Sequence, residues 1–139
     1  MAASSKRMSA RQYRALADFR YELRRFLRYS EETTRRHGMT PLQYQMLLQV
    51  RGHPKRARAT VSELAERLQA KHHGVVALIT RCERAGLVAR EPSAEDGRAV
   101  LVKLTARGQR QLERLARLHR NELLDIQDRL SIPGLGVLR

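Results

Sequence analysis

The chain contains one cysteine, no tryptophan and two phenylalanines among its 139 residues. A single cysteine cannot form an intramolecular disulfide, so the sequence does not belong to the disulfide-stapled class of small domains. No apolar run approaches the roughly 18 residues of a membrane span, and the basic N-terminal residues are not followed by the apolar stretch of a secretory signal. We therefore predict a cytoplasmic protein that has no membrane partner.

Acidic residues are also scarce, with 14 Asp and Glu against 28 Lys and Arg, which gives a formal net charge of +14. Such an excess predicts a polyanion partner, and charge alone does not choose between nucleic acid and an anionic membrane surface. Arginine outnumbers lysine 24 to 4. The planar guanidinium group suits phosphate binding, although a GC-rich genome explains the same ratio equally well.

Two long amphipathic helices are predicted near the ends of the chain. Apolar residues recur at steps of three and four from Ser9 to about Arg36, and again from Thr105 to about Leu130. Gly38 is expected to end the first of these helices. The apolar stripes consist of Tyr13, Leu16, Phe19, Leu23, Phe26 and Leu27 in the first helix, and of Leu112, Leu115, Ala116, Leu123, Ile126 and Leu130 in the second.

Between them the pattern predicts three short helices. Thr40 and Thr60 are followed three residues later by Gln and Glu, the capping-box arrangement that begins a helix. The first short helix should end near Val50, and the third should run from His72 to Ala85. Residues expected to face the core are Leu42, Met46 and Leu47 in the first, Val61, Leu64, Ala65 and Leu68 in the second, and Val75, Leu78, Ile79 and Cys82 in the third.

A β-hairpin is expected next, with strands at residues 87–90 and 100–104, and residues 53–59 are expected to form a basic loop. The second strand alternates, with Val100, Val102 and Leu104 on one face. Helix, turn, helix and basic hairpin, in this order, are typical of a winged helix-turn-helix DNA-binding domain. We assign residues 39–104 to this domain, within a mainly α (α+β) fold, and residues 1–38 and 105–139 to N- and C-terminal dimerisation helices.

The outward face of the third short helix is the predicted DNA-reading surface, because His73 can donate to a guanine edge and Val76 or Ala77 can touch a thymine methyl group. At the hairpin tip, Arg98 is expected to enter a narrow minor groove while Asp96 holds its guanidinium group. The recognition-helix candidates are His72, His73, Val76, Ala77, Thr80, Arg81 and Arg84; the wing candidates are Asp96, Gly97 and Arg98; and possible phosphate contacts are Lys55, Arg56, Arg58 and Arg90. A solvated basic loop is an equal alternative for residues 55–58.

The two apolar stripes also predict a homodimer. Each terminal helix is about 40 Å long at ~1.5 Å per residue, and residues 39–104 are too few to cover both stripes. A two-fold dimer would also place two recognition helices on half-sites about 34 Å apart in a pseudo-palindromic operator. The predicted interface contains Leu16, Phe19, Leu23, Leu123, Ile126 and Leu130.

Three segments together resemble the MarR family of bacterial winged-helix transcription factors. They are residues 61–68, residues 79–90, and Asp96-Gly97-Arg98 followed by residues 102–105 and Gly108. The resemblance implies an obligate dimer, a pseudo-palindromic operator, and repression that is relieved by a small, often aromatic or phenolic, ligand or by oxidants. The chain departs from the family pattern at His72-His73-Gly74, where Ser and Thr are common, and at Ala77, where a basic residue is frequent.

The sequence leaves several other functions open. Cys82 would permit a redox-responsive regulator, but no second cysteine can resolve a sulfenic acid, so a buried inert thiol is favoured. No nucleophile–base pair suggests an enzyme, and we predict no cofactor and no metal, because the histidines that could supply ligands match no known spacing. Those histidines are His37, His53, His72, His73 and His119. A nonspecific, architectural DNA-coating protein and a winged helix used for protein contacts are the remaining alternatives.

Overall fold

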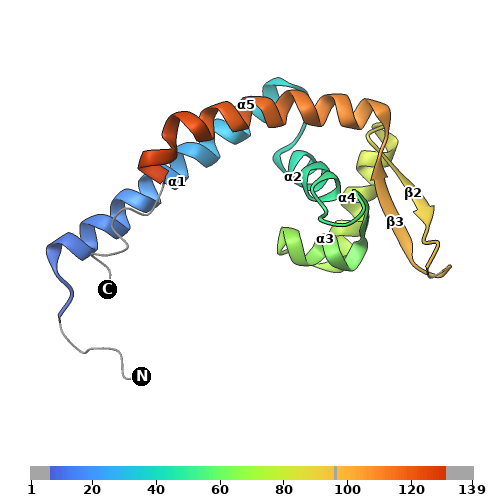
Figure 1. Ribbon diagram of the computed structural model, residues 1–139, viewed down its shortest axis with the longest axis horizontal. Coiled ribbons are helices and arrows are strands. Elements are labelled where there is room, and N and C mark those ends of the chain that lie inside the picture. The colour runs from blue at the N-terminus through green and yellow to red at the C-terminus, as the bar shows by residue number, and fades with distance from the viewer. Residues whose placement is uncertain (1–6, 96, 131–139) are drawn as a thin grey trace. The chain divides into compact units, whose positions relative to one another are not determined.

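The computed structural model describes residues 7–95 and 97–130, the side chain of Leu130 excepted (Figure 1). The elements follow in the order α1 (Ala10–Arg36), α2 (Pro41–Arg51), β1 (Ala59–Thr60), α3 (Val61–Leu68), α4 (His72–Arg84), β2 (Val88–Pro92), β3 (Val100–Leu104) and α5 (Ala106–Leu130). This order confirms the predicted mainly α fold with a winged helix-turn-helix between two long helices. None of the helices in residues 7–95 and 97–130 combines the length and the apolar character of a membrane span.

The chain divides into two compact units. The terminal unit comprises Met1–Ser30 and His119–Arg139, and the central unit comprises Glu31–Leu118. Both long helices therefore contribute residues to both units. The central unit contains the helix-turn-helix, the sheet and the first half of α5.

The helix ends form where the sequence signals place them. Thr40 caps α2 and Thr60 caps α3, and in both capping boxes the threonine side chain and the third-position side chain exchange hydrogen bonds with backbone N–H groups. Gly38 follows α1 with a φ of 77°, in the left-handed region that glycine adopts without strain. The Met39 N–H then donates to the Thr34 carbonyl oxygen at 3.2 Å, which closes the end of α1.

The sheet has three strands in the order β1-β3-β2, and both pairs are antiparallel. β1 was not predicted, because residues 53–59 were expected to form only a loop. Ala59 and Thr60 instead pair with Val102 and Leu101. A strand of two residues carries no alternation to detect, and its partners lie about 40 positions away in the sequence.

One predicted orientation is wrong, and the burial of one strand differs from a simple two-faced pattern. Leu42, expected to face the core, is 49% exposed in the first turn of α2, and Tyr44 is buried instead. In β3, Val100 is 41% exposed whereas Leu101, on the other face, is buried. β3 is the central strand, and Leu101 lines a depression together with Arg56, Arg58 and Pro92.

One apolar core holds the central unit together. Its fully buried side chains come from α2, α3, α4, β3 and α5, and the largest of them are Met46, Leu47, Leu64, Ile79 and Leu115. The start of α5 is fixed by Thr105, whose N–H donates to the Leu87 carbonyl oxygen at 3.0 Å and whose hydroxyl donates to the Gly86 carbonyl oxygen at 2.6 Å. Gly108 allows this approach, because a Cβ atom there would lie 1.9 Å from the Leu87 carbonyl oxygen.

The terminal unit pairs α1 with the second half of α5. The Ser30 hydroxyl lies 2.7 Å from Nε2 of the buried His119, and the rings of Phe26 and Tyr29 meet the His119 ring edge-on. Ile126 is buried, Phe19 and Leu23 are half-buried, and Leu130 lies outside the described side chains. Six large apolar side chains described on these helices remain exposed, namely Tyr13, Leu16, Tyr21, Leu27, Leu123 and Leu124.

Candidate nucleic-acid interface

Helix α4 presents the predicted recognition surface because its other face is anchored in the core. Val75, Leu78, Ile79 and Cys82 are all at most 4% exposed. The residues predicted to read DNA therefore lie on the outward side, with Thr80 half-buried and the rest exposed, namely His72, His73, Val76, Ala77, Arg81 and Arg84. The helix face is as predicted, and base contact by these side chains stays a prediction.

Two of the predicted DNA-binding residues bind each other. Arg90, on β2, donates through Nη1 to the Glu83 carboxylate at 2.7 Å and through Nη2 to the Thr80 hydroxyl at 3.1 Å. The Thr80 hydroxyl in turn donates to the Val76 carbonyl oxygen at 3.1 Å. Sequence reasoning missed Glu83, which joins the wing strand to the recognition helix and offsets part of the charge of Arg90.

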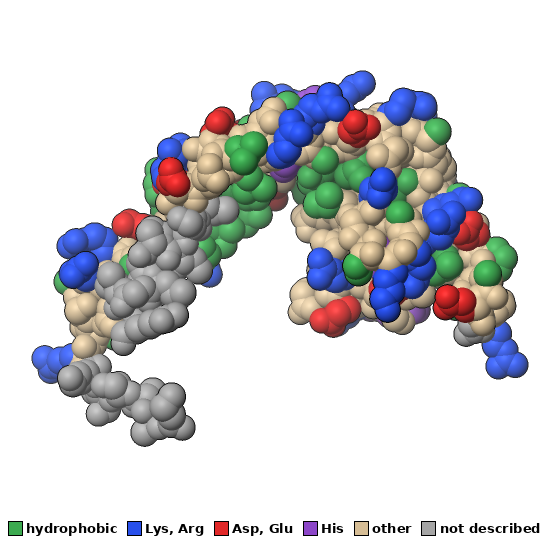
Figure 2. All heavy atoms as spheres, in the orientation of Figure 1, with side chains coloured by type: hydrophobic (Ala, Val, Ile, Leu, Met, Phe, Trp, Pro, Cys, Tyr) green, Lys and Arg blue, Asp and Glu red, His purple; other side chains and the backbone are tan. Residues whose placement is uncertain are grey.

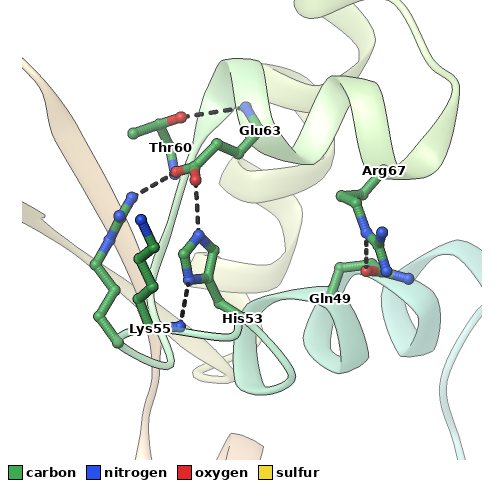
Figure 3. A network of polar contacts seen from close by, with 7 residues as sticks. Gln49, His53, Lys55, Thr60, Glu63 and Arg67 are labelled. Atoms are coloured by element: carbon green, nitrogen blue, oxygen red, sulfur yellow. Dashed lines mark hydrogen bonds and ion pairs between the residues drawn. The ribbon is translucent and has the colours of Figure 1, made fainter.

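The loop before β1 is organised by Glu63, the capping-box carboxylate of α3 (Figure 3). The Lys55 backbone N–H donates to Nδ1 of His53 at 3.2 Å. Because Nδ1 accepts this hydrogen bond, the ring proton of neutral His53 lies on Nε2, which donates to Glu63 at 2.7 Å. The Glu63 carboxylate also accepts from Arg56 and from the Thr60 backbone N–H.

These contacts set the ionisation of Glu63. Burial alone would raise the pKa of its carboxyl group, but hydrogen bonds from Thr60 and His53 and the charge of Arg56 outweigh it and lower the pKa to about 2. Glu63 is therefore a carboxylate throughout the physiological range. Its negative charge balances that of Arg56, one of the predicted phosphate contacts.

Arg58 is paired in the same way. Glu91 on β2 accepts hydrogen bonds from Arg58 and, at 2.9 Å, from the Lys103 ammonium group, and these two cations hold the pKa of Glu91 below its usual value. Within the described residues, Lys55 is the one member of the predicted phosphate set whose side chain forms no ion pair, and it is exposed. The sequence did not reveal that Arg56, Arg58 and Arg90 each face a carboxylate.

The wing places part of its predicted set at an exposed tip. The last strand pair joins Pro92 to Val100, and beyond it the Ser93 N–H donates to the Ala99 carbonyl oxygen at 3.0 Å. Gly97 and Arg98 lie at the tip and are exposed. Asp96 lies outside the described residues, so the expected contact between Asp96 and Arg98 stays a prediction.

Cys82 lies on the core face of α4 and is fully buried. Burial raises the pKa of its thiol to about 11, although the charge of Arg81 acts in the opposite direction. The reactive species in thiol oxidation is the thiolate, which is a minor form at neutral pH when the pKa is this high. These properties favour the structural role over the redox alternative.

We expect Cys82→Ser to lower the free energy of unfolding by on the order of 1–3 kcal/mol, since it places a hydroxyl group in an apolar site. Denaturant titration would measure this loss. Cys82→Ala should keep DNA binding. If peroxide released the parent protein from DNA but not the alanine variant, the redox function would replace the structural one.

The histidines are dispersed. Nδ1 of His37 lies 2.8 Å from the Thr33 carbonyl oxygen, while His53 is bound to Glu63 and His119 lies beside Ser30. Across residues 7–95 and 97–130, no three His, Cys, Asp or Glu side chains are placed to hold a metal ion.

Comparison with known proteins relates this architecture to one family. The model of the MarR family matches residues 37–99. The structure of the MarR family transcription regulator SP03579 is similar at 26% identity and a TM-score of 0.71, over 90% of this chain and 81% of that one. The multiple antibiotic resistance repressor MarR is similar at 25% identity and a TM-score of 0.70, over 86% of this chain and 85% of that one.

A third similar structure contains nucleic acid. It is the F27L mutant of Staphylococcus aureus MepR bound to an oligodeoxyribonucleotide, with 22% identity and a TM-score of 0.65 over 81% of each chain. At this identity the likeness concerns the fold alone. No protein of curated function matches the chain by sequence.

Proposed function

Because the chain belongs to the MarR family of winged-helix transcription regulators, we propose that it is a cytoplasmic homodimeric repressor that binds a pseudo-palindromic operator and is released by a small ligand. Membership in the family confirms the prediction of a DNA-binding transcription regulator rather than an enzyme. The observation that carries the finer proposal is the outward face of α4. Its side chains are exposed while the opposite face of the helix is buried in the core, and Arg98 is exposed at the tip of the wing.

In this proposal the helix face reads bases and the surrounding cations bind phosphates. His73 and Ala77 occupy the centre of the exposed face, so they meet base edges, while Arg81 and Arg84 further along α4 meet the backbone. Arg98 enters the minor groove beside each half-site. Lys55 adds a phosphate contact, and Arg56, Arg58 and Arg90 contribute less because each already faces a carboxylate.

The proposed dimer is supported by the apolar surface of the terminal unit. Tyr13 is 61% exposed, Leu27 is 50% exposed and Leu124 is 56% exposed. Apolar area of this kind on two adjacent helices is stabilised when a second copy covers it. We therefore assign dimerisation to residues 1–38 and 105–139, and DNA binding to residues 39–104.

The relatives support the proposals that the partner is DNA and that the protein represses transcription. A mutant of the relative MepR is described as bound to an oligodeoxyribonucleotide, and the relative MarR is described as a repressor. By analogy we propose duplex DNA as the partner and repression as the outcome. The small aromatic or phenolic ligand is proposed from the family resemblance.

His73→Ala tests base reading directly. We expect it to weaken operator binding by about 1–3 kcal/mol and to leave binding to a scrambled duplex nearly unchanged, since His73 is exposed and contributes nothing to the core. Both affinities would be measured by titration after the operator is found by footprinting the DNA that flanks the gene. Equal losses on the two duplexes would show that α4 does not read bases.

Arg98→Ala tests the wing. We expect operator affinity to fall by about 1–3 kcal/mol and the preference for A·T-rich flanks to diminish, because the narrow minor groove attracts a guanidinium group. Arg14→Ala is the matched control, since Arg14 is an exposed arginine of α1 in the terminal unit. If both variants lost the same affinity, the effect of Arg98 would be one of net charge alone.

The spread of arginine over the whole chain favours one second candidate, a nonspecific DNA-coating protein. A titration at rising salt separates the two functions. An operator-binding repressor keeps a large ratio of specific to nonspecific affinity, whereas a coating protein loses affinity for both duplexes alike.

A further inference from the structure

A row of four arginines follows one side of α5 within the central unit. Arg107, Arg110, Arg114 and Arg117 are spaced by three, four and three residues, which places them on one face of a helix. All four are exposed. We call them the α5 arginine row.

The row faces away from the core and from the proposed operator site. Leu112 and Leu115, on the other side of α5, are at most 3% exposed, and Gly108 lies against the Leu87 backbone. In Figure 1, α3 and the tip of the wing lie at the edge of the central unit away from α5, and Figure 2 shows blue side chains along the α5 edge. A duplex bound to α4 and the wing therefore leaves the row uncovered.

The row is a net source of positive charge. Arg117 pairs with Glu113 at 3.0 Å, and both side chains are about 60% exposed. Arg107, Arg110 and Arg114 form no ion pair with any described residue. Arg56, Arg58 and Arg90, by contrast, each face a carboxylate.

The neighbours of the row indicate which polyanion it fits. The exposed residues from 106 to 118 are Ala106, Arg107, Arg110, Glu113, Arg114 and Arg117, with no aromatic or large aliphatic side chain among them. A membrane surface requires an apolar face beside the charges, and here that face is buried. Most stable protein interfaces are anchored by aromatic or apolar side chains, and the exposed residues of this surface include none. A phosphate backbone requires charge alone.

The dimensions also suit nucleic acid. Ten residues separate Arg107 from Arg117, which is about 15 Å along the helix at ~1.5 Å per residue. At ~3.4 Å of duplex axis per phosphate of each strand, the row is long enough to meet more than one phosphate.

We propose that the α5 arginine row binds the phosphate backbone of a second DNA duplex without sequence preference. Building on the proposed operator binding, a dimer held on its operator by α4 and the wing would carry two such rows on its far side. The protein would then bridge its operator to another DNA segment and raise the local concentration of each near the other.

The test is a capture experiment with the full-length protein. Operator duplex is fixed on beads, protein is added to saturation, and a labelled duplex without the operator is offered in low salt. We expect the parent protein to capture the labelled duplex and Arg110→Glu/Arg114→Glu to capture at least about tenfold less. The slope of log affinity against log salt concentration should also fall by the amount that corresponds to about two lost phosphate contacts. Operator binding itself should change less than about threefold.

The matched control is Arg11→Glu/Arg14→Glu, which makes the same change of charge at two exposed arginines of α1 in the terminal unit. We expect this control to capture the labelled duplex as the parent does. Equal loss in both variants, or no loss in the row variant, would overturn the proposal. Thermal melting would verify that each variant is folded.

A second arm separates the row from the operator site. In Arg81→Ala/Arg84→Ala/Arg98→Ala the recognition helix loses both of its arginines and the wing tip loses Arg98. We expect the duplex binding that remains in this variant to fall at least about tenfold when Arg110→Glu/Arg114→Glu is added. If neither the parent protein nor any variant bound an operator, the proposed function would be wrong. The comparison of these variants on nonspecific duplex would still show whether the α5 arginine row binds DNA. Competition by polyglutamate as strong as that by duplex would indicate an acidic protein partner and overturn the DNA proposal.

Discussion

Leu16→Glu combined with Leu123→Glu should convert the proposed dimer into folded monomers and lower operator affinity at least about a hundredfold. In the single chain these side chains are 42% and 38% exposed, so glutamate at either position meets solvent and the fold of the chain is preserved. In the proposed interface the same substitutions bury four carboxylates per dimer, which is strongly unfavourable. Each monomer would then bind its half-site alone and lose the advantage of linked binding.

Sedimentation equilibrium and an operator titration would measure the two effects. Tyr21→Glu is the matched control, because Tyr21 is 59% exposed and lies ~140° around α1 from Leu16, beside Arg25. The control should remain dimeric. A double variant that kept the dimer mass would place the interface elsewhere.

Gly108→Ala is expected to lower the free energy of unfolding by more than about 3 kcal/mol, at the upper end of the usual cost of overpacking. The added Cβ atom would lie 1.9 Å from the Leu87 carbonyl oxygen and 2.9 Å from its carbon. Both are backbone atoms, so no side-chain rotation can relieve the contact. The start of α5 would have to move away and open the contacts of Leu112 and Leu115 with the core.

Gly74→Ala provides the control by denaturant unfolding. Gly74 lies inside α4, and a Cβ atom there would have no neighbour within 4 Å. The substitution should therefore stabilise the protein by up to about 1 kcal/mol through helix propensity alone. A Gly108 variant as stable as the parent would mean that α5 does not pack this closely on Leu87.

The parts of the fold that could be predicted depend on local signals. The capping boxes at Thr40 and Thr60 and the glycine at 38 each act within about four residues, and the structure shows all three helix ends where these signals place them. The inward face of α4 could also be predicted, because four apolar residues at helical spacing leave one orientation for the helix. That same periodicity identified the candidate recognition face.

The parts that could not be predicted depend on contacts between distant residues. β1 exists because Ala59 pairs with Val102 and Thr60 with Leu101, and Leu101 shares a surface depression with the distant Arg56 and Arg58. The carboxylates that hold the predicted phosphate contacts are equally non-local, since Glu91 lies 33 positions from Arg58. Counting cations along the sequence therefore overstated how much charge the loop and wing present.

The hydrogen bonds at Thr105 have a mechanical consequence for the central unit. A hinge requires a few residues whose backbone can absorb rotation. Here the Leu87 N–H donates to the Cys82 carbonyl oxygen at 2.9 Å, the Leu87 carbonyl oxygen accepts from Thr105, and the Gly108 N–H donates to the Thr105 hydroxyl at 3.0 Å. Because these backbone groups are hydrogen-bonded to one another, we expect the end of α4 and the first turn of α5 to move together as a rigid body. A rotation of α5 would then also rotate α4, because the connecting backbone at Leu87 and Thr105 has no free segment that could act as a hinge.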